Sequence, residues 1–289
     1  MRIDNPYAGA EGPWLRGNLH THSTNSDGSR TPSEIVAAYA ALGYNFLMFS
    51  DHDFFTDPLT VDAREMVLLP GVEVSAWGPH IVHVGATRAV EPAKDRQAVL
   101  SAIQADRGFA IVAHPNWEAH FNHCPQALLE IWEGYTGIEV YNGVIRRLNG
   151  SPRATDRWDR LLGLGRRVWG FAHDDSHTVG DDGLAWNMVC VAERSPNAII
   201  DALSRGACYA STGVIIREIA VTGDTIRVET ENAQRIVIHS DFGHRECATD
   251  GAVAAYCLPE TNPPRYVRFE CWGQGDDMAW TQPFFIEAE

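Results

Sequence analysis

The sequence has 289 residues, of which 45% are hydrophobic, so it can bury the core of one large domain or of two smaller ones, and disorder is excluded as its main state. With 23 Lys and Arg against 38 Asp and Glu, the formal charge of −15 repels polyanions and argues against long nucleic acid as a partner. Lys94 is the only lysine, which leaves almost no candidate for a Schiff base or a phosphate-binding loop lysine.

No stretch approaches about 18 consecutive apolar residues, which is the length that a membrane-spanning helix needs. The first residues also lack the charged start and the apolar middle of a secretory signal. From these two observations we expect a soluble, cytoplasmic protein that has no membrane partner.

Short apolar runs alternate with helical patterns from about residue 17 onward. After a first run at 17–21, Thr31, Pro32 and Glu34 predict the capped start of a helix that runs to about residue 42. Further strands are predicted at 46–50, 67–69, 71–74, 81–84, 109–112, 137–140 and 168–171, and further helices at 95–106, 125–133, 152–163 and 196–204. This alternation is typical of parallel β/α units, and polar residues just after the strands predict a closed barrel with its site at the strands' carboxyl ends.

The pattern changes near residue 212. Short strands are predicted at 215–221, 225–229, 235–239 and 266–271, separated by turns rich in Gly, Asn, Asp and Pro, and no helical period is visible. We therefore predict an α/β barrel over 1–211 and a small C-terminal β-sandwich domain over 212–289.

Metal-ligand side chains gather at the ends of the first two strands. His20 and His22 are two apart, so on a strand both imidazoles point to one face. Asp27 follows on a turn, and the next strand ends in the sequence that carries His52 and Asp53. Two successive strands thus end in residues that bind metals.

The next strands continue this pattern. Glu73 stands in an apolar strand, where a carboxylate is costly to bury unless a cation or donors compensate it. His80 and His83 are three apart and face opposite sides of a strand, so we expect one to bind a metal and the other to pack, with the choice left open.

Two later apolar strands also end in histidine. One is followed by His114 and Asn116, and the other by Asp175 and His177, whose spacing aims both side chains at one point. His, Asp and Glu without cysteine favour Zn, Mn or Fe over a structural zinc knot.

Candidates for proton transfer and substrate binding lie among the same loops. For proton transfer to the leaving group, Asp51, Asp53, Asp174 and His177 are all candidates, of which we select Asp53 and His177 as catalytic. For substrate binding we select Asn116, Asn142 and Arg146, while Arg147 is an equal alternative to Arg146 and a solvated helix start would explain both arginines as well.

Roughly residues 16–211 resemble the PHP (polymerase and histidinol phosphatase) superfamily. The segments that carry the resemblance are, in chain order, 18–22, 26–28, 50–53, 71–73, 113–115 and 175–177. The segments 43–47, 80–85, 174–177 and 279–284 resemble its CehA/McbA-type branch, which commonly carries a C-terminal β domain. The resemblance implies a distorted (β/α)7 TIM-like barrel that holds two or three divalent metal ions.

The resemblance also implies how the ligands are shared. A first ion would be held by His20, His22, Glu73 and Asp175, a second by Glu73, His114 and either His80 or His83, and a third by Asp27, His52 and His177. Asp27 stands where some members of the superfamily have histidine, which leaves the third position open.

The function implied is a metal-dependent phosphoesterase that hydrolyses a small phosphorylated molecule, such as a nucleotide, by attack of a metal-bound hydroxide. A metal-dependent hydrolase of carboxylic or carbamate esters is the alternative among enzymes. A non-catalytic, metal-stabilised binding or regulatory module is an alternative of another class, although none of the core ligand positions has lost its ligand.

Overall fold

The computed structural model describes residues 1–287, so the last two residues of the predicted sandwich, 288–289, lie outside the described residues. The first part of the chain contains strands β1 (Arg2–Asp4), β2 (Trp14–Asn18), β3 (Phe46–Met48), β4 (Val67–Leu69), β5 (Gly71–Val74), β6 (Ile81–Val84), β7 (Phe109–Val112), β8 (Gly137–Asn142) and β9 (Trp169–His173). Among them lie the helices α1 (Pro32–Ala41), α2 (Arg96–Ala105), α3 (Gln126–Ile131) and α4 (Thr155–Gly163) and the 3-10 turns η1 (Pro58–Thr60) and η2 (Val144–Arg147).

The second part is mostly strand. It consists of β10 (Trp186–Cys190), α5 (Pro196–Ser204), β11 (Cys208–Ser211), β12 (Ile216–Thr222), β13 (Thr225–Thr230), β14 (Arg235–Ser240), η3 (Asp241–Gly243), β15 (His244–Asp250), β16 (Val253–Cys257), β17 (Tyr266–Trp272), β18 (Met278–Thr281) and β19 (Phe284–Glu287). Within residues 1–287, none of the helices has the length and apolar character needed to cross a membrane.

The predicted start of helix α1 is confirmed. The Thr31 hydroxyl accepts a hydrogen bond from the Glu34 backbone N–H, and the Glu34 carboxylate accepts one from the Thr31 backbone N–H. Pro32 occupies the first turn, where its missing N–H leaves no helical bond unmade. This capping box fixes the helix directly after the loop that carries Asp27.

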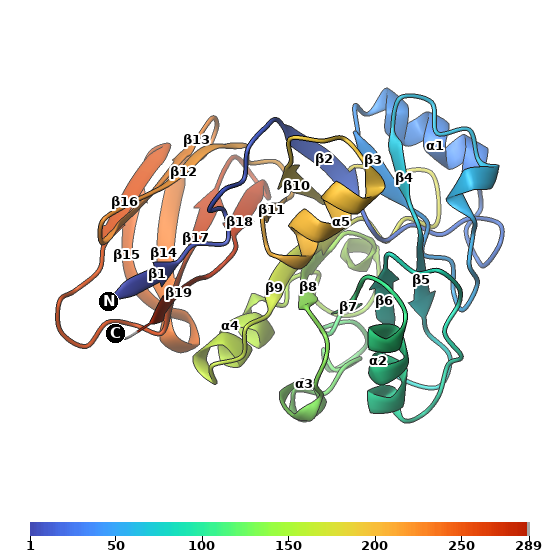
Figure 1. Ribbon diagram of the computed structural model, residues 1–289, viewed down its shortest axis with the longest axis horizontal. Helices are drawn as coiled ribbons and strands as arrows, with labels where there is room; N and C mark the ends of the chain where they lie inside the picture. The colour runs from blue at the N-terminus through green and yellow to red at the C-terminus, as the bar shows by residue number, and fades with distance from the viewer. Residues whose placement is uncertain (288–289) are drawn as a thin grey trace.

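The strands form three sheets. The largest has eleven strands in the order β1-β19-β17-β18-β11-β10-β2-β3-β4, with β14 attached to β17 and β15 to β14. A five-stranded sheet has the order β5-β6-β7-β8-β9, and a three-stranded sheet the order β12-β13-β16. Figure 1 shows the strands β12–β19 gathered at one end, near both chain termini, and the β/α part at the other end.

The fold is a mixed α/β fold, but the closed seven-stranded barrel is not confirmed for the described residues. Strands β2, β3 and β4 pair in parallel, as do β7, β8 and β9, whereas β5, β6 and β7 pair antiparallel. A parallel connection needs about a dozen residues or more, and the segments at 70 and 75–80 are too short to provide one. The chain therefore leaves the first sheet at Pro70 and starts the second as a hairpin.

The C-terminal strands form a two-layer sandwich. Ile226, Val228 and Ala254 of the three-stranded sheet share one apolar core with Ile238 and Phe269 of the large sheet. Strand β11 pairs with β18 and β1 pairs with β19, so the large sheet contains strands from both sides of residue 211. A domain boundary at 211/212 stays a prediction.

A buried ion pair also joins helix α4 to strand β17. The guanidinium of Arg268 donates from Nε and Nη2 to the two carboxylate oxygens of Asp159, at 2.7 and 2.6 Å.

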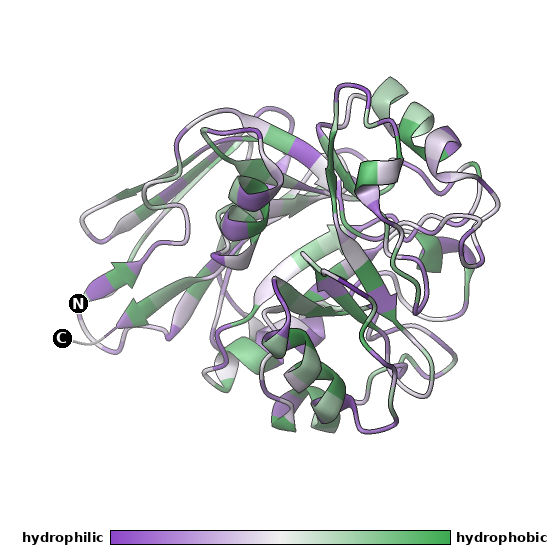
Figure 2. Cartoon of the chain, turned by 45° about the vertical axis from the view of Figure 1, so that its right-hand side comes forward, coloured by the Kyte–Doolittle hydropathy of each residue, from purple (hydrophilic) through white to green (hydrophobic). Residues whose placement is uncertain are grey.

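Hydrophobic and hydrophilic residues alternate along the helices (Figure 2), as in α2, where Val99, Leu100 and Ile103 are buried. The helices thus pack one face against the sheets, which leaves the strand ends free to carry the polar groups.

Candidate metal centre

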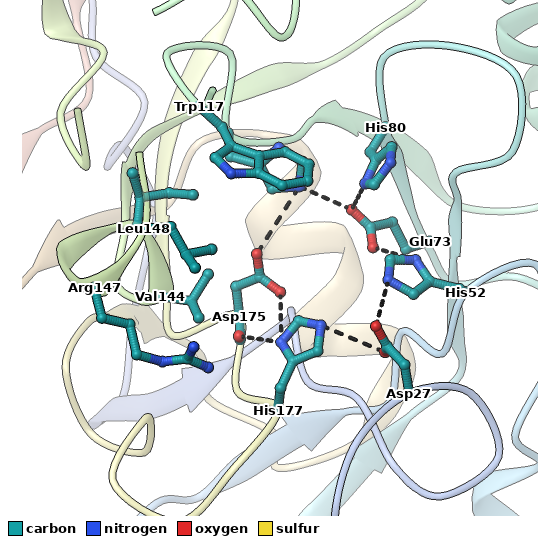
Figure 3. A pocket seen from close by; sticks show the side chains of 12 residues that line it. Asp27, His52, Glu73, His80, Trp117, Val144, Arg147, Leu148, Asp175 and His177 are labelled. Carbon is teal, nitrogen blue, oxygen red and sulfur yellow. Dashed lines mark hydrogen bonds and ion pairs between the residues drawn. The ribbon is translucent and has the colours of Figure 1, made fainter. Parts of the chain in front are cut away.

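Most of the ligand-type side chains predicted from the strand ends line one cavity (Figure 3), and His20 and His22 are buried behind it against Glu73 and Asp175. They extend from the ends of β2, β3, β5, β7 and β9 and from the residue that precedes β6. Because β5 and β6 pair antiparallel, the residue before β6 lies beside the end of β5. The hairpin therefore adds His80 to the same point that the parallel strand ends reach.

Glu73 lies at the centre of the cluster. Its Oε1 is 3.1 Å from His80 Nδ1 and 3.2 Å from both His20 Nε2 and His114 Nε2. Its Oε2 is 2.9 Å from His52 Nδ1. The carboxylate is fully buried, and one such group with imidazoles on both oxygens has the arrangement of a bridging ligand.

Asp175 forms the second point of convergence. Its Oδ1 lies 3.1 Å from His22 Nε2 and 3.2 Å from His20 Nε2. Its backbone φ is 53°, in the left-handed region, and that of His114 is 26°. For residues other than glycine such conformations cost about 1–3 kcal/mol and concentrate at functional sites.

A third group lies at the mouth of the cavity. Asp27 Oδ1 is 3.4 Å from His177 Nε2, and its Oδ2 is 3.6 Å from His52 Nε2. Burial lowers the pKa of His52, but the neighbouring Glu73 and Asp27 carboxylates outweigh it and raise this pKa to about 10. The Asp27 side chain is 56% exposed, so this group is the most open of the three.

The cluster leaves buried polar atoms without hydrogen-bond partners. Among the described residues these include His20 Nε2, both ring nitrogens of His22, His52 Nδ1, Glu73 Oε2 and Asp175 Oδ1. Leaving such atoms unpaired costs free energy in a dry interior, whereas nitrogen and oxygen lone pairs that face one point suit a divalent cation. The residues present therefore fit the metal site that the motifs predicted, and divalent metal binding is supported.

Glu139 of strand β8 is a functional residue that the sequence analysis missed. Its Oε1 accepts from Nδ1 of His20 at 2.6 Å and of His173 at 2.7 Å, and its Oε2 accepts from the His114 backbone N–H at 2.6 Å. Burial raises its pKa, but these donors outweigh burial and hold it well below the usual range. A carboxylate in an apolar strand, the signal that singled out Glu73, was present here as well.

Asn142 lies behind the ligands and not on the cavity wall. Its Nδ2 donates to Glu139 Oε2 at 2.8 Å and to Asp175 Oδ2 at 3.1 Å. The buried amide thus orients two carboxylates, and a substrate contact by Asn142 stays a prediction.

Two further predicted site residues lie away from the cavity. The Asp53 carboxylate accepts from the backbone N–H groups of Ser75 and Ala76, at 2.9 and 3.0 Å, so it holds the loop after β5. His83 points to the opposite side of the sheet, where its Nε2 contacts the Arg107 carbonyl oxygen at 2.6 Å. Of the two histidines of this hairpin, His80 is the one that faces Glu73.

Asn116 and Arg146, which were predicted to bind substrate, do not line this cavity, and that role stays a prediction. The Asn116 amide donates to the Arg153 carbonyl oxygen and accepts from Arg157 Nε, both at 2.8 Å, so it joins two loops. Arg146 lies outside the cavity, with its Nη2 3.8 Å from Asp276 Oδ2, and Arg147 lines the cavity in its place.

The cavity has a volume of about 250 Å³. Besides the ligand-type residues it is lined by Trp117, Val144, Ile145, Arg147 and Leu148. Trp117 packs near His114, with ring centroids 5.1 Å apart. Apart from Arg147, these wall residues were not identified from the sequence, since apolar side chains carry no chemical signature until the fold places them.

Comparison with known proteins gives partial matches. No protein-family model matches the sequence. The chain is 36% identical over 96 residues to a 3',5'-nucleoside bisphosphate phosphatase of Chromobacterium violaceum. The matched region covers 31% of this chain and 33% of that protein. It is 39% identical over 72 residues to a 5'-3' exoribonuclease of Haemophilus influenzae, which covers 23% of this chain and 26% of that protein. The chain thus spans a third or less of the length of these relatives.

The fold has a match along nearly the whole chain. A two-domain protein from Bacteroides vulgatus, described as containing a predicted PHP-like metal-dependent phosphoesterase, superposes with a TM-score of 0.55 over 96% of this chain and 88% of that one, at 15% identity. Membership of the CehA/McbA-type branch stays a prediction. The chain has the fold of this PHP-like protein, and the resemblance to the PHP superfamily that its motifs carry is confirmed.

Proposed function

We propose that this chain is a metal-dependent phosphoesterase that hydrolyses a small phosphate ester and uses two or three divalent ions of Zn, Mn or Fe. The observation that carries the proposal is the set of buried imidazole nitrogens and carboxylate oxygens that face one another around Glu73, among them atoms without a hydrogen-bond partner. The relatives that are named for phosphate-ester hydrolysis support the same choice.

The three groups of side chains would hold the ions in the arrangement that the resemblance implied. The first would take His20, His22, Glu73 and Asp175, the second Glu73, His80 and His114, and the third Asp27, His52 and His177. Bound divalent ions would lower the pKa of a coordinated water toward neutrality and neutralise charge on the phosphoryl oxygens. Glu139 holds His20 by a hydrogen bond at Nδ1, which turns Nε2 toward Glu73.

In hydrolysis the oxygen of water bonds to phosphorus, the bond from phosphorus to the ester oxygen breaks, and that oxygen takes a proton. His177 is placed to supply the proton, because its Nδ1 lies 2.8 Å from the Asp175 carbonyl oxygen and its Nε2 faces the cavity mouth. When Nδ1 donates to this carbonyl, Nε2 is the atom that holds or releases the transferred proton. If the third ion is bound, Nε2 is its ligand instead.

Among phosphate esters we propose a small molecule as substrate. The volume of about 250 Å³ suits a small ester, and the charge of −15 opposes long polyanions. The exoribonuclease names of some relatives make RNA the competing substrate class.

A hydrolase of carboxylic or carbamate esters is a second candidate function. It is favoured by one observation: the cavity wall opposite the ligands is apolar, and its guanidinium, that of Arg147, is already paired with Asp181. Such a wall does not require a phosphate.

The test is metal analysis followed by turnover on the same sample. We expect two or three ions per chain and chelator-sensitive release of p-nitrophenol from p-nitrophenyl phosphate. Turnover of p-nitrophenyl acetate alone would select the second candidate. If metal-loaded protein shows neither activity, a non-catalytic binding module is the remaining interpretation. Glu73→Gln should abolish turnover, whereas Glu270→Gln, which alters a buried carboxylate of the sandwich, should retain it.

A further inference from the structure

The cavity has two unlike walls. Figure 3 shows Glu73, His52 and Asp27 on one side and Leu148 and Val144 facing them from the other. Ile145 and Trp117 extend the apolar wall. Val144 and Ile145 are almost fully buried, while Leu148 is 40% exposed and reaches toward the opening. An apolar wall within a polar site is the feature that binds the non-reacting part of a ligand.

The guanidinium at this wall is already occupied. Arg147 donates from Nε and Nη2 to the two carboxylate oxygens of Asp181, at 2.8 and 2.9 Å. Asp181 Oδ2 also accepts from the backbone N–H groups of His177 and Thr178, at 3.1 and 2.9 Å. The pair is therefore a neutral, bidentate unit.

Within the described residues that line the cavity, Arg147 is the sole arginine or lysine. A phosphoryl group at the ligand cluster would be matched by the ions held there. A second phosphate on the same substrate would meet apolar side chains or a guanidinium whose Nε and Nη2 already bind Asp181, so this wall offers it little charge compensation.

The size of the cavity adds a limit. At about 250 Å³ the cavity lies near the lower end of the range of about 300–1,000 Å³ that is typical of ligand pockets. This space holds a phosphoryl group together with one ring or a short alkyl chain.

We propose that the substrate of this site is an ester whose non-reacting part is a small, uncharged apolar or aromatic group, seated against Trp117, Val144 and Leu148. This inference rests on the proposed function and narrows it to monophosphate esters of aryl or alkyl alcohols. It sets the chain apart from the relative that is named for 3',5'-nucleoside bisphosphates.

The first test compares matched ligands on the metal-loaded wild-type protein. Phenyl phosphate should be hydrolysed with a kcat/KM at least tenfold above that of 4-carboxyphenyl phosphate, although the carboxylate makes the latter the better leaving group. Adenosine 3',5'-bisphosphate should be poorer still. In calorimetry, phenylphosphonate should bind at least tenfold more tightly than methylphosphonate, which is a readout that needs no turnover.

The second test removes part of the apolar wall. Leu148→Asn should lower the affinity for phenylphosphonate at least fivefold and leave the affinity for inorganic phosphate within twofold. Leu164→Asn is the matched control, since Leu164 is 47% exposed at the end of helix α4 and does not line the cavity. Thermal unfolding of both variants checks that the fold is retained.

The outcomes separate the two proposals. If metal-loaded protein hydrolyses none of the phosphate esters, the proposed function fails, and the phosphonate pair still tests the apolar wall. If phosphate esters are hydrolysed but the carboxylated or bisphosphorylated compound is preferred, the proposed function stands and this inference is overturned. Equal affinity for phenylphosphonate and methylphosphonate would also overturn it, as would a Leu148→Asn variant whose affinity for phenylphosphonate equals that of the wild type.

Discussion

Replacing Glu139 with glutamine should weaken metal binding although the residue is not one of the proposed ligands. The wild-type carboxylate accepts four hydrogen bonds: from the imidazoles of His20 and His173, the His114 backbone N–H and the Asn142 amide. In Glu139→Gln the amide oxygen can still accept on one side, but the amide nitrogen faces donors on the other. Two buried donors then lose their acceptor, and the tautomer of His20 is no longer fixed.

The size of the effect follows from these contacts. Each buried donor left without a partner costs about 1–3 kcal/mol, so the free energy of unfolding should fall by about 2 kcal/mol or more. Loss of the group that orients a ligating histidine typically lowers metal affinity by about 10–100-fold. We expect both effects, measured by urea unfolding of the metal-depleted protein and by competition with a chromogenic chelator.

Glu270→Gln is the matched control for Glu139→Gln. The Glu270 carboxylate is also buried and accepts from several donors, the indole N–H groups of Trp272 and Trp280 and Nη1 of Arg268. This variant should lose stability and keep its metal affinity. If Glu139→Gln loses stability to the same extent and its metal affinity stays within twofold of wild type, the positioning argument is refuted.

Three further predictions concern stability. Asp159→Asn should lower the free energy of unfolding by about 3 kcal/mol in urea titration, because it removes the bidentate acceptor of the buried Arg268 guanidinium and leaves Glu270 as its remaining carboxylate partner. Burial and the nearby Arg268 charge lower the pKa of His239 below 6.5, so the unfolded chain binds this proton more readily and stability should fall as the pH drops below about 6.5. His239→Asn should show a smaller fall between pH 7.5 and pH 5.5; an equal fall would contradict this assignment. Chelation should lower the midpoint of thermal unfolding, since an ion present at about 100 times its Kd stabilises the folded state by about 2.7 kcal/mol. If the protein is shown to lose its metal and the midpoint does not change, that result would count against a metal-stabilised site.

Much of the centre could be predicted from the sequence because its signals are local. The spacing of His20 and His22, the isolated carboxylate of Glu73 and the capping box at Thr31 each depend on neighbouring residues alone, and the structure brings the two histidines beside Glu73. Strands β5, β6 and β7 were predicted with their observed bounds for the same reason, since each is a short, mostly apolar run.

The direction of a side chain after a strand end is not local. The catalytic role predicted for Asp53 and the substrate contact predicted for Asn116 therefore stay predictions, and neither residue lines the cavity. Asp53 has the correct chemistry for the site, but its φ of 51° turns the carboxylate toward the backbone of Ser75. Asn116 is likewise drawn to Arg153 and Arg157, which are remote in sequence. Strand β15 was missed because its residues are mostly exposed and show no apolar period; it forms by pairing with β14.

The position of the metal centre follows from the way in which the two sheets meet. Strands β4 and β5 are separated by Pro70 alone, so the chain changes sheets just before Glu73. The two sheets touch there through single bridges, Thr21 with Ser176 and His52 with Glu73. His52 comes from the large sheet and His80 from the five-stranded sheet, and both reach the Glu73 carboxylate. A bound ion would therefore tie together two sheets that share few backbone hydrogen bonds at this seam. Its removal should accelerate amide exchange first at the ends of β2, β3 and β5, and only later in the sandwich, whose core contains none of the proposed ligands.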